Sequence, residues 1–457
     1  MNILALTWKH PQDPTAGGAE RYLVEVASRW VQSGHGVTIF GPSGPAAPWR
    51  TGPGTPNRIT YVGSGSRLTV FRQARAYLRT HGATYDAVLE TVSTRPFAAH
   101  RVVGRRAVAL YYQTAEEVWG HEFPLPVAVL GRYLLEPRWV RSLRDASVVA
   151  ISPSTANALQ RFGVRAQGVV PPGCDVPTEV DLRDRPSDAP HLLWIGRMVR
   201  TKRPEDAISG HALLRARIPA ASLEMVGTGY LHQQLAARQS PGVRLRGPVS
   251  DREKRSLLAQ ADLVLLPGTR EGWGIVAMEA AAYGVPVIAY DVPGLRDAVV
   301  DGVTGVLVEP NPLALAAAAI RVLSDQRAWS RFSKAARERA LAFSWDRCAR
   351  DLLECLTSRF ASTGAQGAPA NSLALPGSVP TGASDPDRPP EPPQLGSVAC
   401  PRRICGKHRQ PSWASRTGLT FGCAAHSTFH ETSERLVQAA SQSRRLPPGL
   451  PGPSSLP

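Results

Sequence analysis

The sequence predicts an α/β protein made of two doubly wound, parallel-sheet domains that face each other across a cleft. Short apolar runs alternate with helical patterns up to residue 360, which is typical of repeated βαβ units. A polar stretch rich in Pro and Asp, residues 176–190, divides this series in two and has the composition of a linker. From residue 361 onward, Pro, Ser and Gly dominate and the hydrophobic periodicity is lost, as in disordered segments. The expected parts are an N-terminal domain 1–175, a C-terminal domain 176–343, a closing helix 344–360 and a disordered tail 361–457.

The N-terminal half begins with an apolar run, residues 3–7, that is typical of a buried strand. A loop rich in turn formers then ends in Gly17-Gly18-Ala19-Glu20, and a helical pattern follows. Strand, glycine-rich loop and helix in this order can bind a phosphate group, although tight turns also use glycine pairs. Further strands are predicted at 37–40, 86–90, 107–112 and 147–151, and a helix over 125–143 that Pro137 could break. Another helix starts at 152–155, where we expect the hydroxyls to be caps rather than nucleophiles.

The C-terminal half centres on one βαβ unit. An apolar strand over 262–266 is followed by a loop with Glu271 and a Gly272-Trp273-Gly274 turn, a helix over 275–283 and a strand over 287–290. Earlier in this half, a strand over 191–196 is followed at once by Arg197 and then by Lys202. The remaining elements are a helix from Pro204, strands at 223–227 and 305–308, two helices that run through 340, and a helix at 345–360.

These loops combine groups that suit one kind of ligand. Ligands of parallel sheets bind at the carboxyl ends of strands, where loops meet helix N-termini. Glu271 and Glu279 can accept hydrogen bonds from hydroxyl groups, while the glycines let backbone amides approach an anion at the helix N-terminus. Arg197 and Lys202 can bind phosphate oxygens. A molecule with both hydroxyls and phosphates, such as a nucleotide sugar, fits this set.

Composition restricts the partners and the compartment. The formal charge is +16, with 48 Arg and 5 Lys spread along the chain, which suits anionic partners. No basic motif with interleaved aromatic residues is present, so we expect no nucleic acid partner. The N-terminus lacks the regions of a signal peptide and no apolar run reaches the length of a membrane span, which predicts a cytoplasmic protein. Six scattered Cys without a CxxC spacing predict neither a zinc site nor a disulfide framework.

The motifs resemble those of glycosyltransferase family 4, a family of retaining enzymes with the GT-B fold. Glu271 and Glu279, with Gly-Trp-Gly-Ile between them, are similar to the family's donor motif, and Gly17-Gly18-Ala19-Glu20 is similar to its N-terminal loop, which closes on the donor diphosphate. Arg197 and Lys202 match the cations that hold this diphosphate in the family. The resemblance covers residues 1 to about 360.

The resemblance implies transfer of a hexose from UDP or GDP to an acceptor hydroxyl of a glycan, a lipid or a small molecule, with retention of configuration. It implies that Glu279 binds the ribose, that Glu271 binds the sugar, and that no metal or other cofactor is required. The only Asp-x-Asp of the chain, at Asp385 and Asp387, lies in the tail. The catalytic set is Glu271, Arg197 and Lys202, and the donor-binding set adds Gly17, Gly18, Val249, Gly272, Trp273, Gly274, Ile275, Val276 and Glu279.

The sequence departs from the family on the acceptor side. Many members have a His at the end of an N-terminal strand, facing the sugar, and Tyr112 or Gln113 would occupy that position here. Neither takes up a proton at neutral pH as His does. A protein that binds a nucleotide sugar or a partner without turnover, or an epimerase of the same fold, therefore stays an alternative. Acidic side chains near the expected acceptor cleft would orient hydroxyls or be solvated: Glu116, Glu117 and Glu122, beside Trp119.

A basic stretch of the N-terminal half has two interpretations. It contains Arg132, Arg138, Trp139, Arg141 and Arg144. A helix of this composition can lie on an anionic membrane, here the inner face of the plasma membrane. An ordinary exposed face with long Arg side chains has the same composition, so both interpretations stay open.

Overall fold

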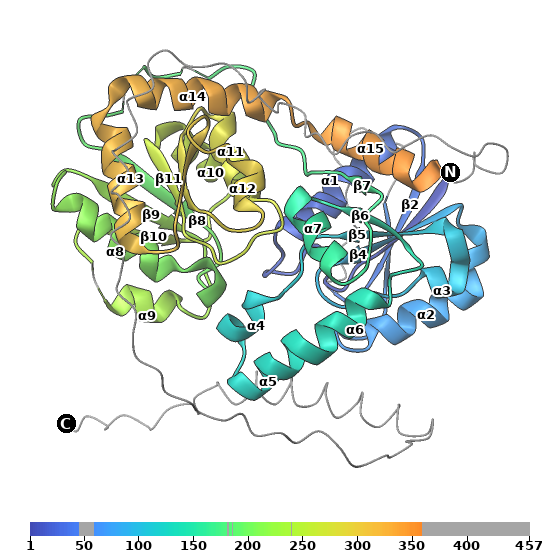
Figure 1. Ribbon diagram of the computed structural model, residues 1–457. Coiled ribbons are helices and arrows are strands. Elements are labelled where there is room, and N and C mark those ends of the chain that lie inside the picture. The colour runs from blue at the N-terminus through green and yellow to red at the C-terminus, as the bar shows by residue number, and fades with distance from the viewer. Residues whose placement is uncertain (45–58, 181, 185, 239, 359–457) are drawn as a thin grey trace, which may run out of the picture. The chain divides into compact units, whose positions relative to one another are not determined.

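The computed structural model describes residues 1–44, 59–180, 182–184, 186–238 and 240–358, all within the unit Met1–Pro376. The predicted tail, 361–457, lies outside the described residues. Two parallel sheets organise the described part (Figure 1), which confirms the predicted fold class of two Rossmann-like domains. The first sheet has the strand order β3-β2-β1-β4-β5-β6-β7, and the second has the order β10-β9-β8-β11-β12-β13.

The first domain alternates strands and helices along the chain. Its strands are β1 (Asn2–Leu6), β2 (Gly36–Gly41), β3 (Thr60–Gly63), β4 (Ala87–Val92), β5 (Ala107–Tyr111), β6 (Ser147–Ala150) and β7 (Gly168–Val169). Its helices are α1 (Gly18–Gln32), α2 (Val70–His81), α3 (His100–Val103), α4 (Glu117–Glu122), α5 (Leu125–Leu130), α6 (Glu136–Arg141) and α7 (Pro153–Arg161).

The second domain repeats this plan. Its strands are β8 (His191–Ile195), β9 (Ser222–Val226), β10 (Val243–Gly247), β11 (Leu263–Leu266), β12 (Val287–Tyr290) and β13 (Gly305–Val308). The helices are α8 (Pro204–Arg215), α9 (His232–Ala237), α10 (Asp251–Gln260), α11 (Ile275–Ala282), α12 (Leu295–Ala298), α13 (Pro312–Ser324) and α14 (Gln326–Leu341), and then α15 (Trp345–Thr357).

Central strand β1 shows why the first sheet is covered on both faces. Its residues 3–6 are fully buried, as expected for a parallel strand between two helical layers. Ile3 packs in a core cluster with Tyr22 of α1, whereas Leu4 packs in another cluster with Phe71 of α2. Because successive strand side chains point to opposite faces, helices lie on both sides of this sheet.

Helix α15 returns the chain to the first domain. Ser344 caps it by accepting from the amide of Arg347 at 3.1 Å. The helix packs along α1 (Figure 1), where the indole of Trp30 donates to the carbonyl of Ala349 at 2.9 Å. The rings of Tyr22 and Trp345 meet edge to face at 5.9 Å between centroids.

The helix expected over 125–143 does not break at Pro137. It runs through α5, a π-helical turn at Gly131–Leu135 and α6, and Pro137 is the second residue of α6. A proline lacks the amide proton and crowds the carbonyl four residues before it. The π turn widens the helix just before Pro137, with the amide of Glu136 bonded to the carbonyl of Gly131, so the helix continues. No helix among the described residues is long and apolar enough to cross a bilayer.

Candidate functional site

The turn between β11 and α11 supplies unbonded backbone amides. Gly274 precedes α11 with φ +102°, a conformation that side chains other than glycine rarely adopt. Trp273 is buried and its ring lies against Phe343 at 5.3 Å between centroids, so its indole belongs to the core. The amides of Trp273, Gly274 and Ile275 donate to no other group in the described part of the chain. The N-terminus of α11 is therefore open to an anion.

Two predicted site residues bind each other. Nζ of Lys202 forms an ion pair with Oε1 of Glu271, and each side chain is about a quarter exposed. Lys202 ends a short 3₁₀ turn after β8, and this turn is tied to the Glu271 loop because the amide of Thr269 donates to the carbonyl of Thr201 at 2.8 Å. The structure thus brings together the expected phosphate ligand and the expected sugar ligand.

Arg197 lies close to the first domain. It follows β8, is exposed, and forms no ion pair with another described residue. Burial lowers the pKa of Lys9, Glu20 raises it, and the charge of Arg197 lowers it further, so the two cations are near neighbours. Nζ of Lys9 donates to the carbonyl of Thr15 at 2.9 Å, whereas the guanidinium of Arg197 forms neither an ion pair nor a hydrogen bond with another described residue.

The N-terminus of α1 approaches that of α11. A Cβ built on Gly18 would lie 2.8 Å from Cδ1 of Ile275, so only glycine fits this approach without movement. The amide of Gly17 donates to Oε2 of Glu20 at 2.7 Å, whereas the amide of Gly18 has no partner among the described residues. Two helix N-termini, both attractive to anions, therefore lie side by side.

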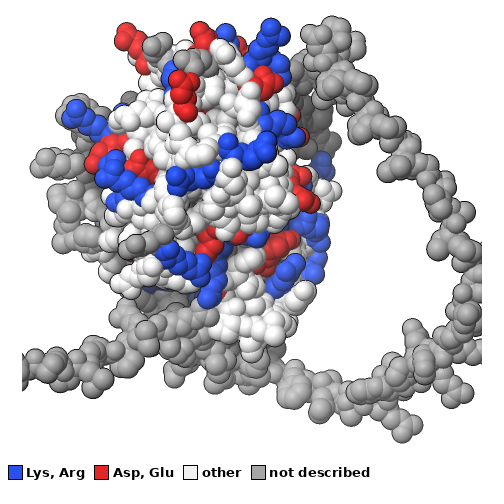
Figure 2. Space-filling model, turned by 90° about the vertical axis from the view of Figure 1, so that its left-hand side faces the viewer, with Lys and Arg blue, Asp and Glu red and all other residues white. Residues whose placement is uncertain are grey.

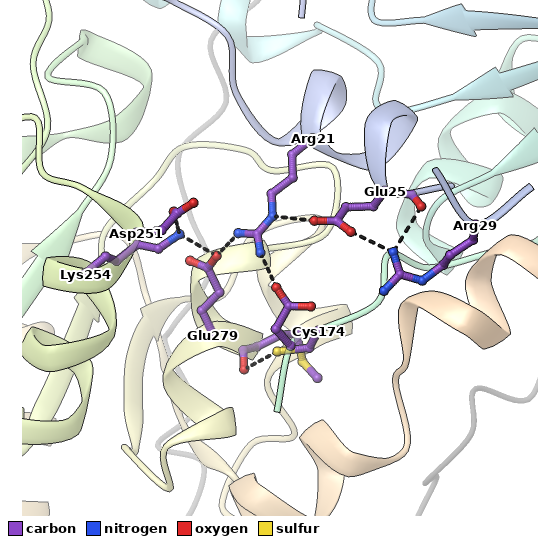
Figure 3. Close-up of polar contacts among 9 residues, drawn as sticks. Arg21, Glu25, Arg29, Cys174, Asp251, Lys254 and Glu279 are labelled. Atoms are coloured by element: carbon purple, nitrogen blue, oxygen red, sulfur yellow. Dashed lines mark hydrogen bonds and ion pairs between the residues drawn. The ribbon is translucent and has the colours of Figure 1, made fainter. Parts of the chain in front are cut away.

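Glu279 lies within a group of charged side chains from both domains (Figure 3). Its Oε1 accepts from Nη1 of Arg21 on α1 and, at 2.8 Å, from Nζ of Lys254 on α10. Arg21 also binds Asp175 through Nη2 at 2.8 Å. The sequence indicated the carboxylate but neither of the two cations that hold it.

The two acceptor-side candidates differ in their contacts. Tyr112 is buried and its hydroxyl donates to the carbonyl of Ala19 at 2.9 Å; burial raises the pKa of Tyr112 well above its ordinary value. Its carbonyl lies against the glycine turn, because a Cβ built on Gly272 would lie 2.8 Å from that oxygen. Gln113 is half-buried, and its side-chain amide group has no polar partner among the described residues. Of the two, Gln113 keeps its hydrogen-bonding groups available.

Acidic residues of α4 and the loop before it bind the second domain. Arg270, buried and next to Glu271, donates through Nε to Glu117 at 2.6 Å and lies 3.4 Å from Glu116. Glu122 accepts from the amide of Thr201 at 2.9 Å and from the hydroxyl of Tyr230 at 2.6 Å. These carboxylates were expected to orient an acceptor or to be solvated, and instead they hold the loops that carry Glu271 and Lys202. Trp119 packs with Trp139 at 6.4 Å, inside a small core cluster.

The other candidates are less exposed to a ligand. Val249, after β10, and Val276, in the first turn of α11, are half-buried and pack against the core. Among the described residues, no group of three or more His, Cys, Asp or Glu side chains could hold a metal ion. On the face that Figure 2 shows, basic and acidic side chains are interspersed rather than gathered in one basic stripe.

Comparisons with known proteins identify the family. The family model of glycosyltransferase family 4 matches residues 16–177, and that of glycosyl transferases group 1 matches residues 178–339. A glycogen synthase of Mycobacterium tuberculosis is 28% identical over 387 residues, which cover 76% of this chain and 92% of that protein. A D-inositol 3-phosphate glycosyltransferase of Paenarthrobacter aurescens is 33% identical over 230 residues, 46% of this chain and 56% of that protein.

Solved structures share the fold at low identity. A sucrose-phosphate synthase from Thermosynechococcus elongatus aligns with a TM-score of 0.63 and 23% identity, over 79% of this chain and 100% of that structure. WaaG, a glycosyltransferase of lipopolysaccharide biosynthesis, aligns with a TM-score of 0.61 and 18% identity over 78% of this chain and 100% of that structure. HepE from Anabaena, solved with UDP and glucose, aligns with a TM-score of 0.58 and 20% identity, over 78% of this chain and 100% of that structure.

Proposed function

This chain belongs to glycosyltransferase family 4, and we propose that it transfers a hexose from a UDP- or GDP-sugar to an acceptor hydroxyl, with retention of anomeric configuration. One observation carries the proposal. The N-termini of α1 and α11 approach each other at Gly18 and Ile275, in the loop and helix that carry Glu271 and Glu279, and Arg197 forms no ion pair with another described residue. Amides and cations suit a diphosphate, and carboxylates suit the hydroxyls at either end of a nucleotide sugar.

The leaving group explains the need for the cations. When the bond between the hexose C1 and the diphosphate oxygen breaks, negative charge grows on the nucleoside diphosphate, and preorganised positive charge lowers the barrier. Arg197 offers a planar fork to phosphate oxygens and Lys202 a compact charge. Lys202 is paired with Glu271, so donor binding would exchange Glu271 for phosphate and free the carboxylate for the sugar hydroxyls. In this proposal the protein's own cations replace a metal ion.

The names of the relatives include a glycogen synthase and a D-inositol 3-phosphate glycosyltransferase, whose acceptors belong to different chemical classes. We propose Gln113 as the acceptor-side residue, since the hydroxyl of Tyr112 is already bonded to Ala19. HepE was solved with UDP and glucose, which makes UDP-glucose the first donor to test.

The experiment is a panel of UDP, GDP and their hexose derivatives, each added to the wild type and to Arg197→Ala. A ligand that binds only the folded chain raises the thermal midpoint by mass action. We expect one nucleotide series to stabilise the wild type and to stabilise the variant much less. Failure of every nucleotide to shift the wild-type midpoint would refute donor binding. Two assays distinguish the alternatives. Conversion of the donor sugar without an acceptor, followed by NMR, would indicate an epimerase. No release of nucleoside diphosphate in the presence of cell extract would indicate a non-catalytic binder.

We also propose that the segment α5–α6 contacts an anionic membrane. Leu125 and Tyr133 are 77% and 69% exposed, and Val129 between them is also exposed. The three lie four residues apart, a spacing that places them on one side of a helix. Exposed Arg138 lies in the same segment, and the guanidinium of Arg132 lies 5.6 Å from the ring of Tyr133. An exposed apolar row beside cations suits the boundary between lipid tails and anionic headgroups.

Vesicle co-sedimentation tests this contact. We expect the wild type to bind phosphatidylcholine vesicles that contain phosphatidylglycerol more than pure phosphatidylcholine, and to bind less in high salt. Leu125→Ser combined with Tyr133→Ser should weaken binding about tenfold or more, because it removes two exposed apolar side chains that the membrane would bury. Leu313→Ser on α13 is the matched control, since Leu313 is 68% exposed on the other domain. Equal binding by the double variant and the control would refute this contact.

A further inference from the structure

The carboxylate of Glu279 is held on one side only. Both cations, Nη1 of Arg21 and Nζ of Lys254, contact Oε1 (Figure 3). Oε2 accepts from no group in the part of the chain that the structure describes. An ionised carboxylate has acceptor sites on both oxygens, so Oε2 keeps its full capacity for a ligand.

Arg21 is fixed at several points. Its Nη2 binds Asp175 at 2.8 Å, and its Nε lies 3.8 Å from Glu25, one helical turn along α1. Burial alone would lower the pKa of Arg21, but Glu279, Asp175 and Glu25 together raise it above its ordinary value. A planar guanidinium bonded at two nitrogens cannot rotate freely, so it also restricts the carboxylate that it binds.

The two cations come from different domains. Lys254 and Glu279 both belong to the second domain, whereas Arg21 lies on α1 of the first, three residues after Gly18, which touches Ile275. Lys254 can therefore hold Glu279 without help from the first domain. Arg21 reaches Glu279 only while the N-termini of α1 and α11 are together.

We propose that Arg21 is a positioning residue for recognition of the donor's ribose. It holds Oε1 of Glu279 from across the domain boundary, so that Oε2 is presented to a ribose hydroxyl. This role rests on the proposed function, in which Glu279 binds the ribose. Arg21 itself touches neither the sugar nor the reacting atoms.

The test compares affinities for a nucleoside diphosphate and its 2′-deoxy and 3′-deoxy analogues by calorimetry. UDP is the first probe, and GDP replaces it if GDP binds more tightly. In the wild type we expect loss of the critical hydroxyl to weaken binding about tenfold, the usual effect of one hydrogen bond to a charged group. Arg21→Ala also removes a positive charge and so weakens every diphosphate, but the ratio between ribose and deoxyribose affinities cancels that effect.

The expected results form a series. Glu279→Ala should reduce the ratio of ribose to deoxyribose affinity to about one, and Arg21→Ala should reduce it to about three or less. Arg21→Lys should give a ratio between those of Arg21→Ala and the wild type, since Lys bonds with one nitrogen only. Arg347→Ala is the control, because it also removes a positive charge but its ion pair, with Asp351 at 3.5 Å, lies outside the group that holds Arg21 and Glu279. It should keep the wild-type ratio.

Two failures can be told apart. A wild-type ratio in both Arg21 variants, together with a lost ratio in Glu279→Ala, would overturn the positioning role and leave the ribose role of Glu279 intact. A wild-type ratio in Glu279→Ala would overturn the ribose role, and with it the proposal for Arg21.

Discussion

Replacing Arg270 by Ala should destabilise the chain more than removal of an ordinary surface cation. The side chain of Arg270 is 4% exposed and donates to Glu117 at 2.6 Å and to the hydroxyl of Thr114 at 3.3 Å. Breaking a buried ion pair from one side costs about 3–5 kcal/mol. Glu117 is 40% exposed and can regain water, and Glu116 keeps its pair with Arg161, so we expect about 2–3 kcal/mol.

The assay is thermal and urea unfolding, followed by tryptophan fluorescence. A loss of this size lowers the midpoint temperature by about 4–12 °C for a domain of this length. Arg296→Ala is the control, since Arg296 and Asp291 pair at 3.0 Å with both side chains about half exposed; its effect should stay within about 0.5 kcal/mol. Equal destabilisation by the two variants would refute the idea that Arg270 is a buried link between the domains.

The pH dependence of this effect has a definite sign. Burial raises the pKa of Glu117, but the hydrogen bond and the charge of Arg270 outweigh this effect and lower the pKa below its ordinary 4.5. An acid with a lowered pKa in the folded state stabilises the fold above its unfolded pKa and loses this contribution as the pH falls through the folded pKa. The difference in stability between wild type and Arg270→Ala should therefore shrink below pH 4.5.

Three other changes test separate parts of the account. Glu279→Ala should weaken UDP or GDP binding by about 1–3 kcal/mol, with Gln less harmful, and unchanged affinity in calorimetry would remove Glu279 from the site. Burial raises the pKa of Glu90 from 4.5 to about 7, so the charged form destabilises the fold as the pH rises through this interval. Glu90→Gln should gain up to about 3 kcal/mol over wild type between pH 5 and 8 in urea titrations, and a constant difference would contradict this. A chain that ends at Thr363 should fold and bind nucleotide like the full chain, and loss of its unfolding transition would show that the tail is needed.

The sequence was most informative where burial is simple. Parallel strands buried on both faces appear as short apolar runs, so β1, β8 and β11 were predicted within one or two residues. Helix α2 was not predicted, although the sequence contains a signal for it. Its buried residues, Val70, Phe71, Ala74 and Leu78, follow helical spacing. Edge strand β3 is only four residues long and half-exposed, so its apolar pattern is weak.

The partners of the site residues were beyond sequence reasoning. The two glycine loops and the carboxylates were predicted as parts of one site, and the structure brings Gly18 to Ile275 and Lys202 to Glu271. Arg21 and Glu279 are 258 positions apart, and their pairing depends on the packing of two domains. Local periodicity contains no information on such long-range pairs, which is why Glu117 and Glu122 were expected to orient an acceptor or to be solvated, whereas they bind the other domain.

The most direct test of the central proposal is hexose transfer from a labelled UDP- or GDP-hexose into acceptors of a cell extract, measured in EDTA. The proposal predicts that wild-type transfer and release of nucleoside diphosphate persist in EDTA, because Arg197 and Lys202 supply the charge that the leaving diphosphate needs. Arg197→Lys should lose much of the activity, and Arg197→Ala nearly all of it. Transfer that vanishes in EDTA and returns with Mg²⁺ or Mn²⁺ would contradict the proposal.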